Sequence, residues 1–341
     1  MSDLRQLAPA RAKQKIMTPA EDLVQLRGKQ YFAEEKKDGL RELLHCSPSA
    51  NRITSRRQSV KDGLFVEKTP NVPHIRDLRT PAGWIIDGEV VSRWGETSHQ
   101  QCANTVSVMG SNEYNALALQ KRHGWNTFEV FDVLFADGKD VRLFALKDRL
   151  KLLEAFLEMT YEATERDDEY TFKYGKAQDH FFRMRSTKPG EDFTGFYESI
   201  MEECGEGIII KDLTKPYNHA RAWFKWKHRF TMDVVLLGNY EPAKFGVTGK
   251  FYGMGGAFYF GLYKGGKLVP IGKCSGMDDA TRLEMTKLAD SKQLGGKVVQ
   301  ISGYEVTKAG LIRNPNFDCW RPDKIPAECT YENQLEVAKR W

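Results

Sequence analysis

Two stretches of the chain place β-branched and aromatic residues between turn formers. Residues 84–91 read WIIDGEVV, and residues 127–135 read TFEVFDVLF. Such compositions are typical of strands that pack against a core. The sequence ADGKD directly after the second stretch predicts a turn. We therefore expect two strands here, each ending at a turn.

After these two stretches, apolar residues recur at the spacing of a helix. Leucines recur every three or four residues in ALKDRLKLLEAFLEM, which predicts an amphipathic helix over residues 145–159. A second helix is expected over residues 193–204, because Gly205 ends the pattern, and the apolar run GIIIKD after it predicts a buried strand. Strands that alternate with helices indicate a domain of mixed helix and sheet. The polar and aromatic segment 161–189 gives no clear pattern.

The last third of the chain changes character. The segments GAFYFGLY and LVPIGK flank Gly265-Gly266, which predicts a β-hairpin, and one helix is expected over residues 278–292. Several short strands with one helix in about 110 residues suit a five-stranded barrel of the oligonucleotide-binding type. We therefore predict two domains, residues 1–229 and residues 230–341.

Composition narrows the class of protein. The net charge of +5 permits a polyanionic partner, but 46 acidic residues nearly balance 51 basic ones. A basic groove must therefore come from folding rather than from a charged tail. The chain has no run of about 18 apolar residues to span a bilayer and no apolar core of a signal peptide. Six cysteines without a Cys-x-x-Cys pair fit a reducing compartment. We expect a cytoplasmic protein with no membrane partner.

The stretch YFAEEKKDGLREL, residues 31–43, contains adjacent lysines before an Asp-Gly. If it is a strand that runs into a turn, Glu34 and Lys36 share one face, whereas Glu35 and Lys37 share the other. Only one lysine can then point into a pocket. Taken alone, the stretch favours a surface hairpin with both lysines in solvent. A lysine nucleophile would also need help to lose its proton, from burial, other cations or a metal ion.

Several other side chains could supply that help. Asp87 and Glu89 share one face of a predicted strand, and Glu206 stands at the start of another. Carboxylates at such positions can hold Mg²⁺, although each alone is more typical of a solvated strand end. Lys225 and Lys227 share a face in WFKWK, which suits either a phosphate clamp or an exposed edge strand. The aromatic ring of EVFDV could stack on a base or belong to the core.

Seven such elements stand in a fixed order. They are EEKKDGLR, SRR at residues 55–57, DGE, FEVFDVLFADGKDV, EGIIIKD, WFKWK and RNPNFDCWRPDK at residues 313–324. In this order and at these spacings the sequence resembles the ATP-dependent DNA ligases of the covalent nucleotidyltransferase superfamily. The resemblance covers nearly the whole chain and implies an α+β fold. An adenylation domain of antiparallel sheets with helices would be followed by an OB-fold β-barrel.

The resemblance also implies a reaction in three steps. Lys36 would attack the α-phosphorus of ATP, the AMP would pass to the 5′-phosphate of nicked double-stranded DNA, and the 3′-OH would displace it. The Lys-x-Asp-Gly spacing selects Lys36, so Lys37 is expected to be dispensable for adenylylation. Mg²⁺, with Mn²⁺ as a substitute, would bind near Glu89 and Glu206. The family resemblance further implies a monomer that serves DNA replication, repair or recombination.

The other site residues follow from the same resemblance. Phe131 would stack on adenine, and Glu34 would lie beside the edge of the base. Residues expected to contact ribose or the nick phosphate are Arg41, Arg56 and Glu89. Lys225 and Lys227 would offset phosphate charge, and Arg221 joins the nucleotide-binding set. Residues of the barrel expected to meet the leaving pyrophosphate are Arg321, Asp323 and Lys324.

Other functions compete with this one. An RNA ligase and an mRNA-capping guanylyltransferase share the lysine chemistry, but the Asp-Gly after the lysine, the FD element and the RPDK ending favour a DNA ligase. A single-strand binding module would use the barrel yet have no use for Lys36. Only about 30 residues precede the first motif, so we expect a minimal two-domain enzyme without a DNA-encircling domain.

Overall fold

The computed structural model of this 341-residue chain describes residues 26, 28–217, 219, 222–227, 229–243, 251–304, 306–307 and 310–335. The chain divides into two compact units, and the division falls after Lys227. Unit 1 contains all elements up to β10 (Trp223–Lys227), and unit 2 contains the elements from β11 (Phe230–Pro242) onward. The assignment of residues 1–229 and 230–341 to two functional domains stays a prediction.

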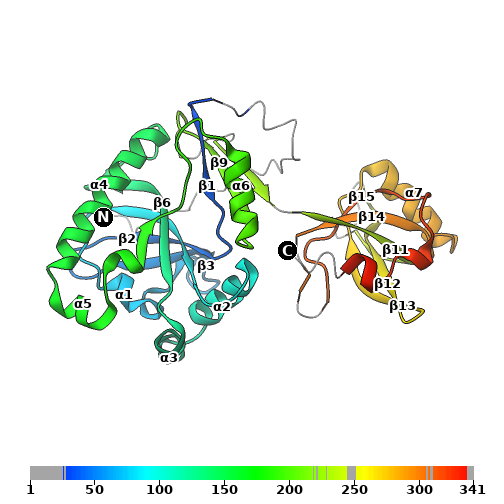
Figure 1. Cartoon of the computed structure of the whole chain (residues 1–341), viewed down its shortest axis with the longest axis horizontal. Coiled ribbons are helices and arrows are strands. Elements are labelled where there is room, and N and C mark those ends of the chain that lie inside the picture. The colour runs from blue at the N-terminus through cyan, green and yellow to red at the C-terminus, as the bar shows by residue number, and fades with distance from the viewer. Residues whose placement is uncertain are drawn as a thin grey trace. The chain divides into compact units, whose positions relative to one another are not determined.

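A small antiparallel sheet in unit 1 has the order β1-β9-β10, with β1 at Tyr31–Glu35 and β9 at Gly207–Asp212. Successive side chains along each strand point to opposite faces of this sheet. One face packs with α6 (Phe193–Glu202) in a buried apolar cluster of Ala33, Ile200, Ile208, Ile210 and Trp226. The other face carries Ile209, Lys211 and Trp223. The strand expected in GIIIKD and the helix expected over residues 193–204 are confirmed, and Figure 1 shows α6 beside β1 and β9.

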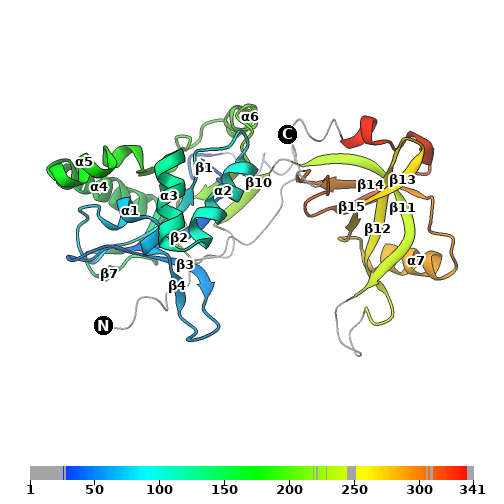
Figure 2. The same cartoon turned by 90° about the horizontal axis from the view of Figure 1, so that it is seen from below.

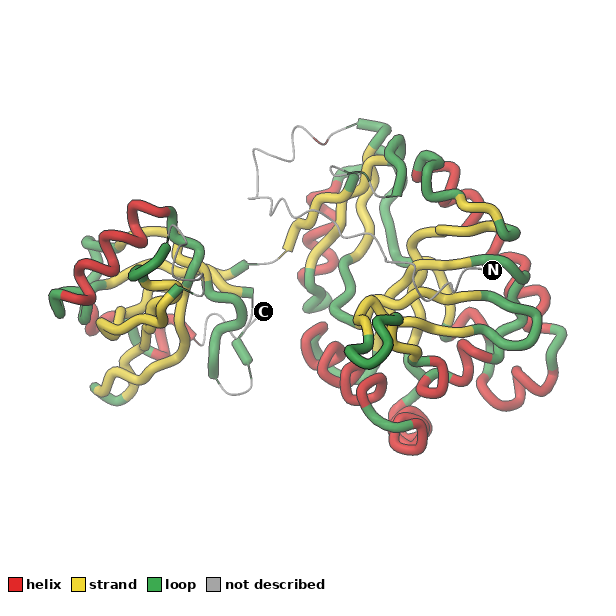
Figure 3. The backbone as a smooth tube through the Cα atoms, turned by 180° about the vertical axis from the view of Figure 1, so that it is seen from behind, coloured by secondary structure: helices red, strands yellow, loops and turns green. Residues whose placement is uncertain are grey.

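A larger sheet forms the body of unit 1. Its strands follow the order β4-β3-β2-β5-β6-β7, and β8 adds to β6 in parallel. The bounds are β2 Leu40–His45, β3 Arg52–Gln58, β4 Phe65–Glu67, β5 Ile85–Val91, β6 Thr127–Ala136, β7 Lys139–Asp140 and β8 Phe181–Arg183. The two strands expected at residues 84–91 and 127–135 are confirmed as β5 and β6. Figure 3 shows these strands inside unit 1 with helices around them.

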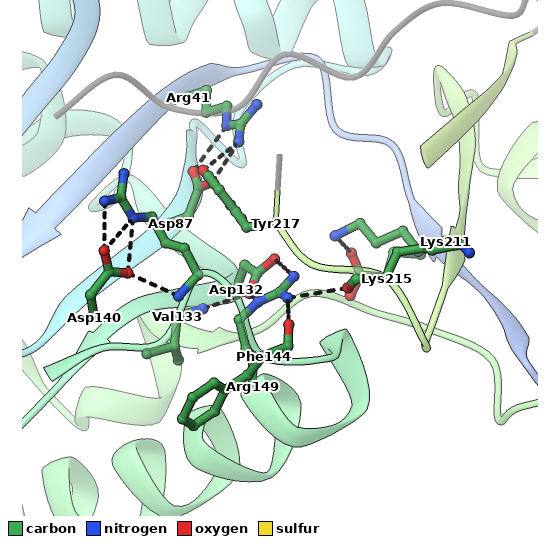
Figure 4. Close-up of polar contacts among 12 residues, drawn as sticks. Arg41, Asp87, Asp132, Val133, Asp140, Phe144, Arg149, Lys211, Lys215 and Tyr217 are labelled. Atoms are coloured by element: carbon green, nitrogen blue, oxygen red, sulfur yellow. Dashed lines mark hydrogen bonds and ion pairs between the residues drawn. The ribbon is translucent and has the colours of Figure 1, made fainter. Parts of the chain in front are cut away.

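Helix α4 (Leu146–Glu165) covers β6 and confirms the helix expected from residue 145 onward. It runs six residues beyond the predicted end at residue 159, because Thr160 and Thr164 continue its buried stripe. Arg149 on this helix is fully buried and binds Asp132 of β6 through two hydrogen bonds, of 2.7 and 2.8 Å. Figure 4 shows this pair and the bond from Arg149 to the Phe144 carbonyl. A bidentate pair of this kind fixes the helix on the sheet.

Four further α-helices lie in the described part of unit 1. Their bounds are α1 Pro73–Arg76, α2 Ser98–Gly110, α3 Glu113–His123 and α5 Asp168–Tyr174. The side chains of Thr97 and Asn112 cap α2 and α3 by accepting hydrogen bonds from backbone N–H groups. Figure 2 shows these two helices side by side. The segment 161–189, which had no clear pattern, forms the end of α4, then α5 and β8.

In its described residues, unit 2 is a curled antiparallel sheet of order β13-β12-β11-β14-β15 with one α-helix, α7 (Asp279–Asp290). The outer strands β13 (Lys267–Cys274) and β15 (Asn316–Trp320) meet where Ser275 bridges Asn316 in parallel, so the sheet curls back on itself. The remaining strands are β12 Gly255–Lys264 and β14 Val298–Gly303. The helix over residues 278–292 is confirmed within two residues at each end.

The hairpin expected in the last third joins β12 and β13. Lys264 and Lys267 are Cα partners on either side of the turn. Gly265 and Gly266 both have positive φ angles, of +55° and +77°, as the tight turn requires. Among the described residues, no helix combines the length and the apolar character that crossing a bilayer requires.

Candidate nucleotide site between the two sheets of unit 1

Lys36 directly follows β1, at the point where the strand ends. Its backbone N–H donates to the Gly207 carbonyl at 2.8 Å, so the start of β9 fixes its position. Its side chain forms an ion pair with Glu206, and only 13% of the side chain is exposed. Lys227 forms an ion pair with the other oxygen of the same carboxylate. Three residues that lie far apart in the sequence therefore share one contact.

Lys225 adds a third lysine to this group from the middle of β10. Burial lowers its pKa, and the positive charges of Lys36 and Lys227 lower the pKa further. Three ammonium groups face one carboxylate, Glu206, which leaves an excess of positive charge. Such an excess favours binding of phosphate groups.

A cluster of buried aromatic and apolar side chains lies between the two sheets, and Trp223 in it shares a face of β10 with Lys225. Phe131 of β6 is 7% exposed, and its ring meets that of Trp223 edge-on at 6.0 Å between centroids. The Lys211 ammonium lies 4.4 Å from the Phe131 centroid and 4.5 Å from that of Trp223. Lys211 also forms a buried ion pair with Glu34 of β1. Burial raises the pKa of Glu34, although Lys211 opposes the rise.

Arg41 of β2 also lies close to these rings. Its Cζ is 5.3 Å from the Phe131 centroid and 5.2 Å from that of Trp223. Arg41 Nε donates to Asp87 Oδ1 at 2.9 Å, and Tyr217 donates to the other carboxylate oxygen at 2.5 Å (Figure 4). The family resemblance implies that Arg41 contacts ribose or phosphate. The structure adds that Asp87 and Tyr217 orient its side chain. Tyr217 comes from a loop, where no periodicity could indicate it.

Glu89 lies across from Arg41 in the β2–β5 register. Burial raises its pKa to about 7, while Lys36 and Arg41 lower it and the neighbouring charge of Glu206 raises it. The carboxylates of Glu89 and Glu206 therefore act on one another near Lys36. Within the described ranges no three His, Cys, Asp or Glu side chains gather as a metal site. A pair of carboxylates still fits Mg²⁺, which usually takes one or two from the protein and the rest from phosphates and water.

Five of the expected residues are not among the contacts described above: Arg56, Arg221, Arg321, Asp323 and Lys324. Arg56 is exposed on β3, and its charge helps to lower the pKa of the buried Glu42. Arg221 lies outside the described residues. Arg321 and Lys324 belong to unit 2, where they line a cavity of about 270 Å³ together with Trp320 and Lys297. Arg321 binds Asp233 at 2.8 Å and Asp323 at 3.0 Å.

Comparisons with known proteins agree with this geometry. The family model described as the ATP dependent DNA ligase domain matches residues 10–227. DNA ligase 2 of Korarchaeum cryptofilum is 24% identical over 366 residues, which cover 93% of this chain and 57% of that protein. A DNA ligase of Thermococcus fumicolans is 26% identical and covers 90% of this chain and 54% of that protein. This chain thus spans about half the length of the curated relatives.

Solved structures show the same fold. A structure from work on DNA binding by Lig E DNA ligases has a TM-score of 0.59 at 20% identity, and it covers 92% of this chain and 99% of that chain. The structure named Pmar-Lig_PreS3 has a TM-score of 0.59 at 18% identity and covers 92% of this chain and 68% of that chain. Unit 1 has the antiparallel sheets and helices of an adenylation domain, and the curled sheet of unit 2 fits an OB fold. With more than half of its length matched by the family model, the chain belongs to the ATP-dependent DNA ligase domain family.

Proposed function

We propose that this protein is an ATP-dependent DNA ligase that seals nicks in duplex DNA through a Lys36-AMP intermediate. One observation carries the proposal. Lys36 lies with Glu206, Lys225 and Lys227, and Lys225 shares a face of β10 with Trp223, whose ring meets that of Phe131. A purine bound against these rings would bring its phosphates toward the three lysines.

The proposed first step follows from these contacts. The Lys36 Nζ attacks the α-phosphorus of ATP, a P–N bond forms, and the bond to pyrophosphate breaks. Lys36 must also lose a proton in this step, and this proton passes to the surrounding water, because the proposed Mg²⁺ would occupy the Glu206 carboxylate beside it. Lys225 and Lys227 offset the charge that accumulates on phosphate oxygens in an in-line displacement.

Mg²⁺ would be held by Glu89 and Glu206, and when bound it would offset phosphate charge and orient the phosphates. In the second step the 5′-phosphate at the nick takes AMP from Lys36, and the P–N bond breaks as a phosphoanhydride forms. In the third step the 3′-OH attacks the same 5′-phosphate and releases AMP. Action as a monomer and a location in the cytoplasm stay predictions.

Incubation with α-labelled ATP and Mg²⁺ tests the nucleophile. We expect the wild-type protein to carry the label and Lys36→Ala to carry none, because no other group would form the covalent bond. Lys121→Ala, on the surface of α3, serves as a matched control and should label like the wild type. Equal labelling of Lys36→Ala and the wild type would overturn the proposed mechanism.

The substrate is tested with nicked duplexes in which either strand at the nick is DNA or RNA. Sealing of the DNA nick is the expected result. Sealing of RNA nicks alone would indicate an RNA ligase instead. Labelling by GTP but not ATP would indicate the chemistry of a capping guanylyltransferase.

A further inference from the structure

Lys37, the residue after the proposed nucleophile, lies in a cluster of charged side chains. Its Nζ is 2.6 Å from Glu35 Oε1 and 3.7 Å from Glu129 Oε2. The two glutamate side chains are 9% and 5% exposed, and that of Lys37 is 23% exposed. Charged groups are seldom buried to this degree unless they are paired. The contact is therefore part of the protein interior rather than a surface ion pair.

The cluster links the two sheets of unit 1. Glu35 is the last residue of β1 in the small sheet, and Glu129 belongs to β6 in the large sheet. Strand alternation puts Glu129 on the same face of β6 as Phe131, and the β5–β6 register sets it opposite Glu89. The ammonium of Lys37 thus joins the strand that precedes the nucleophile to the strand that carries the aromatic ring.

Both carboxylates depend on this ammonium. Burial raises the pKa of Glu129, Lys37 lowers it, and the charge of Glu35 raises it again. Thr127 donates one further hydrogen bond to Glu129, at 3.3 Å. Without the Lys37 charge, two buried carboxylates would face each other, and an uncompensated buried charge is strongly destabilising.

Backbone hydrogen bonds fix the chain on both sides of the turn. The N–H of Glu35 donates to the Arg185 carbonyl at 2.9 Å, and that of Lys36 donates to the Gly207 carbonyl. After the turn, β2 pairs with β5 from Leu40 onward. Directly after Lys36, the Lys37 side chain adds a contact with Glu129 of the large sheet. We therefore expect this contact to help set the direction of the Lys36 side chain.

We propose that Lys37 is a positioning residue, which holds the turn after β1 through Glu35 and Glu129 so that Lys36 points at the α-phosphorus of ATP. This inference rests on the proposed function, and it replaces the expectation from the motif spacing that Lys37 is dispensable for adenylylation. Lys37 itself does not touch ATP. Its effect should therefore fall on the rate of adenylylation and not on the binding of the nucleotide.

Single-turnover adenylylation without DNA tests the role, with Lys37→Met as the variant. We expect the maximal rate to fall about tenfold to a hundredfold, the scale of a small misplacement of a reacting group. The ATP concentration at half-maximal rate should change by less than about threefold, because Phe131 and Trp223, the proposed contacts of the base, are unchanged. Lys37→Arg keeps the charge and should recover most of the rate. The triple variant K37M/E35Q/E129Q, which leaves no charge at these three positions, should unfold at a higher temperature than K37M.

The controls separate this inference from the proposed function. Absence of label on the wild-type protein would overturn the function, whereas wild-type labelling with an unimpaired Lys37→Met would overturn only the role of Lys37. A variant that loses rate only through weaker ATP binding, or an Arg variant as slow as the Met variant, would also overturn it. If Lys37→Met does not fold, Glu129→Gln carries the test, since it keeps the pair with Glu35. A selective loss of maximal rate supports the role, and an unchanged rate contradicts it.

Discussion

Glu42 is a buried acid in the large sheet of unit 1, on the face of β2 opposite Arg41. Only 2% of the residue is exposed, and its Oε2 has no hydrogen-bond partner among the described residues. Burial raises the pKa of this carboxyl well above its usual range, although the charges of Lys68 and Arg56 oppose the rise. The folded protein therefore binds the Glu42 proton more tightly than the unfolded chain does.

This linkage predicts how stability depends on pH. A raised pKa in the folded state contributes stability below the unfolded pKa near 4.3, and the contribution is lost as pH rises. Glu42→Gln removes the charge and keeps the shape, so it should stabilise the protein by on the order of 1 kcal/mol at pH 8. The gain should shrink toward pH 5.

Thermal unfolding of both proteins between pH 5 and pH 8 measures the difference. Glu162→Gln on the surface of α4, where the side chain is 73% exposed, provides the control and should show no such trend. A destabilised Glu42→Gln at pH 8 would mean that the charged carboxylate is favourable where it lies.

For single residues, the sequence predicted which side chains form the site better than it predicted their contacts. Lys36, Glu206 and Lys227 could be selected because their motifs stand in a fixed order, and the structure brings them together. The partners of Lys37 could not be selected, because Glu35 and Glu129 come from different sheets whose pairing no local pattern specifies. Tyr217 could not be selected either, because it lies in a loop, where residues follow no periodic pattern.

Among the elements, the turn between β1 and β2 shows why a glycine follows Asp38. A Cβ on Gly39 would lie 2.4 Å from the Val90 carbonyl oxygen and 2.9 Å from Cγ of Glu89. The backbone of β5 thus comes too close for any side chain. The close approach brings the turn that carries Lys36 against the strand that carries Glu89.

Gly39→Ala should therefore push the turn away from β5. We expect adenylylation to slow at least about tenfold and stability to fall by about 1–3 kcal/mol, the usual cost of overpacking. Gly110→Ala is the matched control, because nothing lies within 4 Å of the added Cβ at the end of α2. Normal adenylylation by Gly39→Ala would show that the turn can move without moving Lys36.

The elements that the sequence predicted have a strong one-sided pattern. Helix α4 and strands β5, β6 and β9 bury continuous apolar faces. Helices α2 and α3 were not predicted, since α2 buries only Thr105, Val108 and Met109, and α3 only Ala116 and Gln120. Their positions depend on polar side chains such as Asn71, which donates to the carbonyls of Val108 and Ser111. Such bonds leave no periodic signal.

For the whole molecule, the near balance of charges makes the response to salt informative. With 51 basic and 46 acidic residues, the proposed DNA substrate would have to be bound by a folded arrangement of cations that meets its phosphates. Affinity for a nicked duplex should fall at least about tenfold between roughly 50 and 200 mM salt. Sealing at sub-saturating DNA should fall with it.

Adenylylation in the absence of DNA, at saturating ATP, is the reference for this measurement. It should change far less over the same range, because no duplex is bound. Equal losses in both assays would place the salt effect in the first step, and a flat response in both would argue against a groove that follows the DNA backbone.

The bridge between Ser275 and Asn316 has a consequence for how copies of this protein behave together. The Phe317 N–H donates to the Ser275 carbonyl at 2.8 Å, so backbone groups of the two outermost strands of unit 2 are hydrogen-bonded to each other there. An open sheet would offer both margins as templates on which strands of other molecules could add, the usual start of aggregation. By curling until its margins meet, this sheet limits that growth, which would help a protein of modest net charge stay dispersed at high concentration.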